Sequence, residues 1–166
     1  NESDAGIVRL ANQVIKDAYD QGASDIHIEP YPGKQPTEIR FRRDGACYKY
    51  QAVPPTHSNP LVSRVKIMAK LDIAEKRLPQ SGKIKLKYGK KDIELRVEVT
   101  PTTGRREDIV MRILASGKPL AIDQMAFSEA NLKNVIELIE KPYGIILVVG
   151  PTGSGKTTTL HSVLGH

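Results

Sequence analysis

The sequence predicts an α+β domain, with two helices packed on a mainly antiparallel sheet, followed by the beginning of an α/β domain. In the first part, two segments with apolar residues at helical spacing alternate with short strands bounded by turn residues. Near the end, an unbroken apolar run at 145–149 leads into a glycine-rich loop, as expected of a parallel strand covered on both faces. Between them, residues 116–119 have the composition of a linker. We therefore expect one domain over residues 1–117 and a second over 118–166.

The elements expected in the first domain follow from local patterns. Two dipeptides, Asp44-Gly45 and Gly89-Lys90, indicate tight hairpin turns. Alternating apolar residues predict the strands, and helical apolar spacing predicts the helices. The first expected element is a helix with apolar residues between 7 and 18, which Ser3 or Asp4 can cap and Gly22 can end. It is followed by strands 25–29, 39–41 and 47–50, helix 58–70, a loop at 71–80, strands 84–88 and 93–99, a loop at 100–106, and strand 109–114.

The second domain is expected to start with a helix, a strand and a loop that runs into another helix. Ser128 can cap a helix over the apolar residues 132–139, which ends before Pro142. The run 145–149 is predicted to be a strand, and residues 156–164 a helix. These elements are too few to bury both faces of a parallel strand, so we expect the chain to be part of a longer protein.

The glycine-rich loop matches the phosphate-binding pattern G-x-x-x-x-G-K-[ST], which should arise by chance in roughly one chain of this length in two hundred. In such a loop, backbone N–H groups and the helix N-terminus point at phosphate oxygens. Lys156 reaches the β- and γ-phosphates, and the Thr157 hydroxyl can ligate Mg²⁺, so these two are the predicted catalytic residues. The predicted nucleotide-binding residues are Gly150, Pro151, Thr152, Gly153, Ser154, Gly155, Lys156, Thr157 and Thr158.

Composition narrows the classes of protein to which the chain can belong. With 39% hydrophobic and 27% charged residues it resembles an ordinary globular protein, and no apolar run approaches the roughly 20 residues of a membrane span. Cys47 is the only cysteine, which leaves no disulfide framework or zinc cluster. The net charge of +6 suits an anionic partner or a solvated surface. Aromatic residues make up only 5%, so base-stacking platforms for nucleic acid are poorly supplied.

Several stretches of the chain stand out together. They are Ala-Ser-Asp-Ile-His-Ile-Glu-Pro at 23–30, Arg-Phe-Arg-Arg-Asp-Gly at 40–45, Lys-Ile-Met-Ala-Lys-Leu-Asp-Ile-Ala-Glu-Lys-Arg-Leu-Pro-Gln at 66–80, Pro-Thr at 101–102, Val-Met-Arg-Ile-Leu at 110–114 and Tyr-Gly-Ile at 143–145. With the phosphate loop, they resemble the motor ATPases of type II secretion and type IV pilus assembly, the GspE/PulE/PilB group. The stretch at 66–80 is the most specific part of the resemblance.

The resemblance implies an N-terminal PAS-like domain, joined by a linker to a RecA-like ATPase domain that uses ATP and Mg²⁺. It also implies a cytoplasmic homo-hexamer that lies peripherally at the inner membrane, is held there by platform or assembly proteins, and powers protein secretion or pilus assembly. In that family the Walker B acid and later motifs follow the phosphate loop at positions beyond His166. We therefore expect the full-length protein to hydrolyse ATP and this chain alone to show no turnover.

Arginines in family-like contexts are candidates for stabilising the γ-phosphate of a nucleotide on a neighbouring subunit. These candidate trans-acting residues are Arg77, Arg96 and Arg112. Each could instead be an ion-paired arginine on a solvated strand. The chain departs from the family at Lys83, where the family often has arginine. Lysine, unlike arginine, cannot bind a phosphate bidentately. It also has extra basic residues, Arg105 and Arg106, in the loop before Glu107.

Other polar patterns admit more than one interpretation. Asp25, His27 and Glu29 alternate along one strand and suggest a metal or acid–base site, although a polar outer face explains them more simply. The alternate lysines at 83–87 fit an anionic lipid, an acidic subunit or the solvated face of an edge hairpin. Two other functions stay open. One is a nucleic-acid translocase of the conjugation type, and the other is a non-catalytic adaptor that binds a partner through its first domain.

Overall fold

The computed structural model describes residues 2–114, 120–151 and 154–166. The chain divides into two compact units, residues 1–116 and residues 117–166. The first unit contains all the strands that are described, together with two long helices, and the second contains the short helices that follow.

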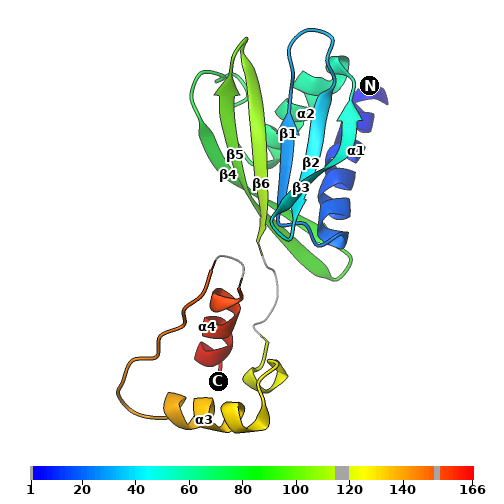
Figure 1. The fold of residues 1–166 in the computed structure, drawn as a ribbon. Coiled ribbons are helices and arrows are strands. Elements are labelled where there is room, and N and C mark those ends of the chain that lie inside the picture. Colours follow the sequence, from blue (N-terminus) through cyan, green and yellow to red (C-terminus); the bar gives the residue numbers. More distant parts are fainter. Residues whose placement is uncertain (1, 115–119, 152–153) are drawn as a thin grey trace. The chain divides into compact units, whose positions relative to one another are not determined.

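The first unit is built on one six-stranded antiparallel sheet with the strand order β3-β2-β1-β6-β5-β4 (Figure 1). β1 lies near the middle and pairs with β2 on one side and β6 on the other. The predicted α+β class, with two helices packed on an antiparallel sheet, is therefore confirmed for this unit. Its elements are α1 (Glu2–Asp20), β1 (Asp25–Glu29), β2 (Thr37–Arg43), β3 (Ala46–Val53), α2 (Pro55–Met68), β4 (Gln80–Tyr88), β5 (Lys91–Thr102) and β6 (Arg106–Leu114).

Both predicted hairpin turns form at the residues that the sequence indicates. β2 and β3 are joined by Asp44 and Gly45, whose φ angles of 51° and 81° suit a type I′ turn. Aspartate and glycine are among the residues that tolerate this left-handed conformation. β4 and β5 are joined at Gly89 and Lys90, as predicted.

The predicted loop at 100–106 is wrong in its extent. β5 and β6 stay paired until Thr102 meets Arg106, so the strands continue through most of that range. Pro101 favours a loop in a sequence-based prediction, because proline removes a ladder hydrogen bond. It is tolerated here because the pairing of β5 with β4 ends at Val99, which leaves β5 as an edge strand at the proline.

The hydrophobic core lies between the sheet and the two helices, which cover one of its faces (Figure 1). The strands contribute alternate residues to it, as their period of two requires. The side chains at its centre are Val14, Ile15 and Ala18 of α1, Leu61 and Val65 of α2, and Ile26, Ile28, Ile39, Phe41, Leu95, Val97, Ile109 and Met111 of the strands. The opposite face of the sheet is left to the polar residues that alternate with these.

The second unit contains the elements η1 (Ile122–Gln124), α3 (Glu129–Ile139) and α4 (Lys156–Leu164). Ser128 caps α3 as predicted, because its side chain accepts a hydrogen bond from the backbone N–H of Asn131 at 3.3 Å. Across the described residues of both units, no helix combines the length and the apolar character that a membrane crossing requires.

The strand predicted at 145–149 is wrong. None of these residues belongs to a strand, and Ile145, Leu147 and Val149 are exposed. A parallel strand forms only where a neighbouring strand supplies its hydrogen bonds. The described residues of the second unit include no other strand that could pair with this run.

Candidate functional site

The phosphate-loop residues lie at the start of α4. Gly155 is the residue before the helix, and its φ of 89° is a left-handed conformation that glycine adopts without strain. α4 then begins at Lys156, as predicted. The first N–H groups of a helix have no acceptor within it and point beyond its N-terminus, toward this loop. Thr152 and Gly153, which the sequence also assigns to the site, lie outside the described residues.

Lys156 folds back over its own loop. Its Nζ donates hydrogen bonds to the carbonyl oxygens of Gly150 and Pro151, each at 2.7 Å. Ser154 Oγ also donates to the Pro151 carbonyl, at 2.7 Å. The ammonium group is thereby held beside the N-terminus of α4. A cation next to the free N–H groups of a helix makes a site that attracts phosphate oxygens.

The threonines that follow Lys156 differ in their surroundings. Thr159 Oγ1 donates to the Gly155 carbonyl at 3.1 Å, which ties this side chain to the helix backbone. Thr157 and Thr158 are exposed in the first turn of α4. Thr157 is the residue predicted to hold Mg²⁺, and an exposed hydroxyl directly after the loop lysine fits that role, since the ion would also contact the phosphates.

The candidate arginines lie in two different places. Arg96 of β5 and Arg112 of β6 are cross-strand partners, and Lys83 of β4 is the partner of Arg96 on its other side. Their neighbours along the strands, such as Val97 and Met111, are buried under the helices, so this row of cations lies on the open face of the sheet. Arg77 is outside the row, in the loop between α2 and β4.

A buried carboxylate holds Arg112 on the open face. Arg112 Nε donates to Asp25 Oδ1 at 3.0 Å, and Arg42 Nε lies 3.7 Å from Asp25 Oδ2. Asp25 is only 4% exposed, whereas the alternation of its strand predicts a solvated side chain. The two guanidinium groups and the Ser24 hydroxyl, at 2.8 Å, compensate for the loss of water around this charge.

The alternating polar residues of β1 have different surroundings. Glu29 accepts two hydrogen bonds from Arg40, at 2.8 and 2.7 Å. His27 Nε2 is buried and has no hydrogen-bond partner in the described chain, and burial lowers the pKa of this histidine. Within the residues that the structure describes, no three His, Cys, Asp or Glu side chains are grouped to hold a metal ion. His27 and Glu29 are partly exposed, whereas Asp25 is buried.

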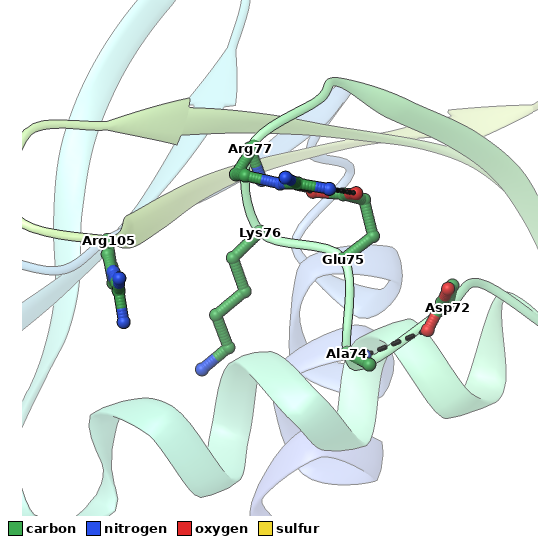
Figure 2. A pocket seen from close by; sticks show the side chains of 6 residues that line it. All are labelled: Asp72, Ala74, Glu75, Lys76, Arg77 and Arg105. Carbon is green, nitrogen blue, oxygen red and sulfur yellow. Dashed lines mark hydrogen bonds and ion pairs between the residues drawn. The ribbon is translucent and has the colours of Figure 1, made fainter.

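Arg77 is bonded to its own loop. The Glu75 carboxylate accepts hydrogen bonds from the Arg77 backbone N–H at 2.6 Å, from Nε at 3.2 Å and from Nη2 at 2.9 Å. Figure 2 shows the guanidinium group lying against this carboxylate. The bonds from Arg77 lower the pKa of Glu75 to about 2, so the carboxylate stays charged. The side chain of Arg77 is nevertheless 85% exposed.

Sequence reasoning missed a buried ion pair that anchors the same loop. Lys66 Nζ donates to Glu107 Oε1 at 2.6 Å and to the carbonyl oxygen of Glu75 at 2.7 Å. Lys66 is 1% exposed and Glu107 3%. One signal could have found the pair: Lys66 continues the helical spacing of the apolar residues Val62 and Val65 and therefore lies on the buried face of α2.

Comparisons with known proteins agree with the resemblance in sequence. Residues 1–166 match the family described as Type II/IV secretion system protein. The chain is 47% identical over 163 residues to the type IV pilus assembly ATPase PilB of Myxococcus xanthus, covering 97% of this chain and 28% of that protein. It is 46% identical over 165 residues to the type II secretion system ATPase E of Vibrio cholerae, covering 99% of this chain and 32% of that protein.

A solved structure supports the fold. The ATPase DotB of Legionella pneumophila matches with a TM-score of 0.52 and 19% identity, over 95% of this chain and 41% of that one. At this identity the likeness concerns the fold alone. The chain spans 28% and 32% of the length of its relatives from Myxococcus and Vibrio. The match over all its residues, together with these identities, shows that the chain belongs to the Type II/IV secretion system protein family.

Proposed function

We propose that the chain is part of an ATPase that powers type II protein secretion or type IV pilus assembly, and that the loop 150–158 binds ATP with Mg²⁺. The observation that carries this proposal is the position of Lys156, which lies over the carbonyls of Gly150 and Pro151 at the N-terminus of α4. On binding, its ammonium group exchanges these carbonyls for β- and γ-phosphate oxygens, and Thr157 supplies a ligand to Mg²⁺. Both relatives named above are described as ATPases, which supports the proposal.

The proposed architecture is a PAS-like domain over residues 1–117, followed at 118–166 by a linker and the beginning of a RecA-like domain. We propose a homo-hexamer for the full-length protein, in which cations of one subunit act on the nucleotide of the next. Arg96 and Arg112 are candidates because they lie together on the open face of the sheet, and Arg77 is a third candidate from the loop. Such a group stabilises the charge that develops on the γ-phosphate during transfer.

The proposed partners are platform and assembly proteins of the inner membrane, which hold the ring peripherally on its cytoplasmic side. The names of the relatives support a place in a secretion or pilus machine. Nucleic acid is not a proposed partner, because aromatic side chains, on which bases stack, amount to only 5% of the chain.

Replacement of the loop lysine tests the nucleotide site. In the full-length protein, we expect Lys156→Ala to weaken the binding of Mg-ATP by about 10- to 100-fold, because charge-assisted hydrogen bonds to phosphate are lost. Isothermal titration calorimetry measures the affinity, and circular dichroism checks that the fold is kept. Lys133→Ala, on the exposed surface of α3, removes the same charge and should bind as the unchanged protein does. Equal affinity in the two variants would show that the loop is not the site.

An assay of ATP turnover by the chain alone tests whether the catalytic groups lie within these 166 residues. The 166 residues span about a third of each relative, so we expect them not to hydrolyse ATP above background, even if they bind nucleotide. The full-length protein should hydrolyse ATP. A coupled steady-state assay on both proteins measures this, and turnover by the chain at the rate of the full-length protein would contradict the expectation.

A further inference from the structure

A second group of cations surrounds a cavity in the first unit. The cavity has a volume of about 420 Å³ and is lined by Asp72, Ala74, Glu75, Lys76, Arg77 and Arg105. Lys76 comes from the loop between α2 and β4, and Arg105 comes from the turn between β5 and β6. Figure 2 shows both side chains extending from their separate loops into the same space.

The loop that carries Lys76 is held in place by side-chain bonds to its backbone. Gln80 closes the loop, because its Oε1 accepts from the Asp72 N–H and its Nε2 donates to the Asp72 carbonyl, each at 2.9 Å. Lys66 Nζ and Gln80 Nε2 both donate to the Glu75 carbonyl, at 2.7 and 3.1 Å. A loop fixed in this way loses little conformational freedom when a ligand binds to it.

At the cavity, the acidic side chains are hydrogen-bonded within their own loop, whereas two of the cationic side chains are not. Glu75 is bonded to Arg77, and Asp72 Oδ1 accepts from a backbone N–H of its own loop at 2.8 Å. Lys76 and Arg105 have neither an ion pair nor a side-chain hydrogen bond within the part of the chain that the structure describes. An ammonium group with three N–H donors and a guanidinium group with five are therefore available at this cavity.

We propose that this cavity binds a phosphate group through Lys76 and Arg105. A phosphate group carries close to two negative charges at neutral pH and several acceptor oxygens, which suit two cations with many donors better than a single carboxylate does. Arg105 follows Gly104 in the hairpin turn between β5 and β6, and their φ angles of 57° and 74° are those of a tight turn. The phosphate belongs to a soluble diphosphate or nucleotide, or to a lipid head group. Neither Lys76 nor Arg105 belongs to the phosphate loop or to the candidate trans-acting arginines.

Calorimetric titration of the 166-residue chain with pyrophosphate tests this site. Every chain in the experiment carries Lys156→Ala, so that binding at the phosphate loop is weakened. In that background, we expect Lys76→Gln and Arg105→Asn each to weaken pyrophosphate binding by about tenfold or more, because charge-assisted hydrogen bonds are lost. Asparagine is chosen because it tolerates a positive φ. Lys90→Gln removes the same charge from an exposed turn and should leave the affinity unchanged.

Two results would overturn the proposal. One is the absence of pyrophosphate binding in the Lys156→Ala chain, and the other is an equal affinity in the Lys76→Gln, Arg105→Asn and Lys90→Gln chains. Thermal unfolding of each variant checks that the fold is kept. Co-sedimentation with phosphatidylcholine vesicles that contain phosphatidic acid separates the two sources. Vesicle binding that is lost in Arg105→Asn assigns a lipid head group, whereas pyrophosphate binding without vesicle binding assigns a soluble phosphate.

Discussion

At the scale of the residue, Lys66 and Glu107 form a buried ion pair in the first unit. Their side chains are 1% and 3% exposed, and their charged atoms lie 2.6 Å apart. Transfer of such charges out of water costs several kcal/mol for each ion, and the pairing offsets this cost only with good geometry and further hydrogen bonds. The bond from Lys66 to the Glu75 carbonyl is one of these. The pair thereby connects α2, β6 and the loop that carries Arg77.

We expect Lys66→Met to lower the free energy of unfolding by about 3–5 kcal/mol, because the Glu107 carboxylate is left buried without its partner. Addition of Glu107→Gln should restore part of this loss, since the amide has no charge. Urea unfolding followed by circular dichroism measures both values. Lys49→Met is the matched control, because it breaks a surface pair with Glu38 and should cost less than about 1 kcal/mol. A loss in Lys66→Met no larger than in this control would be the contradicting result.

At the scale of elements, the junction between α2 and β4 depends on a glycine. A Cβ atom at Gly82 would lie 2.6 Å from the backbone oxygen of Ala69 and 2.9 Å from Cδ2 of Leu71. Ala69 is the C-cap residue of α2 and is buried in the core, so its carbonyl cannot move without repacking. The absence of a side chain at Gly82 thus allows β4 to pass directly against the end of the helix.

Two glycine replacements test this junction with opposite expected signs. Gly82→Ala should destabilise the first unit by about 1–3 kcal/mol, because the new methyl group overlaps backbone that is fixed by packing. Gly6→Ala, within α1, has no atom within 4 Å of the new Cβ and should stabilise the unit by about 0.5–1 kcal/mol through helix propensity. Thermal unfolding of both variants measures the shifts. A shift of the same sign in the two would show that the contact at Gly82 does not matter.

At the scale of the whole molecule, the two units differ in how much they bury. The hydrophobic core consists entirely of first-unit residues, from Ala11 in α1 to Met111 in β6. In the described part of the second unit, only Ile122 and Ser162 are buried. Apolar burial is the dominant favourable contribution to folding, so the first unit contains what it needs to fold by itself.

We therefore expect residues 1–114, produced alone, to fold and to unfold in one cooperative transition. Residues 120–166, produced alone, should show no cooperative transition, because they bury too little apolar surface. Circular dichroism during heating measures both, and the complete chain serves as the control. A broad, non-cooperative loss of signal in the 1–114 piece would mean that its core is not sufficient.

Local signals predicted most of the elements, because they act within a few residues. The turn at Asp44-Gly45, the cap at Ser128 and the start of α4 at Lys156 all form as predicted. The wrong predictions concern segments whose structure depends on strand partners elsewhere in the sequence. The apolar run 145–149 has strand composition but no partner strand in the described part of its unit, and Pro101 stays in β5 because its edge position tolerates it.

The sequence by itself determined the family, the helices and hairpins of the first unit, and the pattern of the phosphate loop, because these depend on short stretches of residues. Only the tertiary structure decided which charges meet. Lys66 and Glu107 are 41 positions apart, and Asp25 and Arg112 are 87 apart. Likewise, Lys76 and Arg105 reach one cavity from separate loops. A charge is stable away from water only beside its counterpart, and the pairing of β1 with β6 and the packing of α2, which bring together residues far apart in the sequence, select that counterpart.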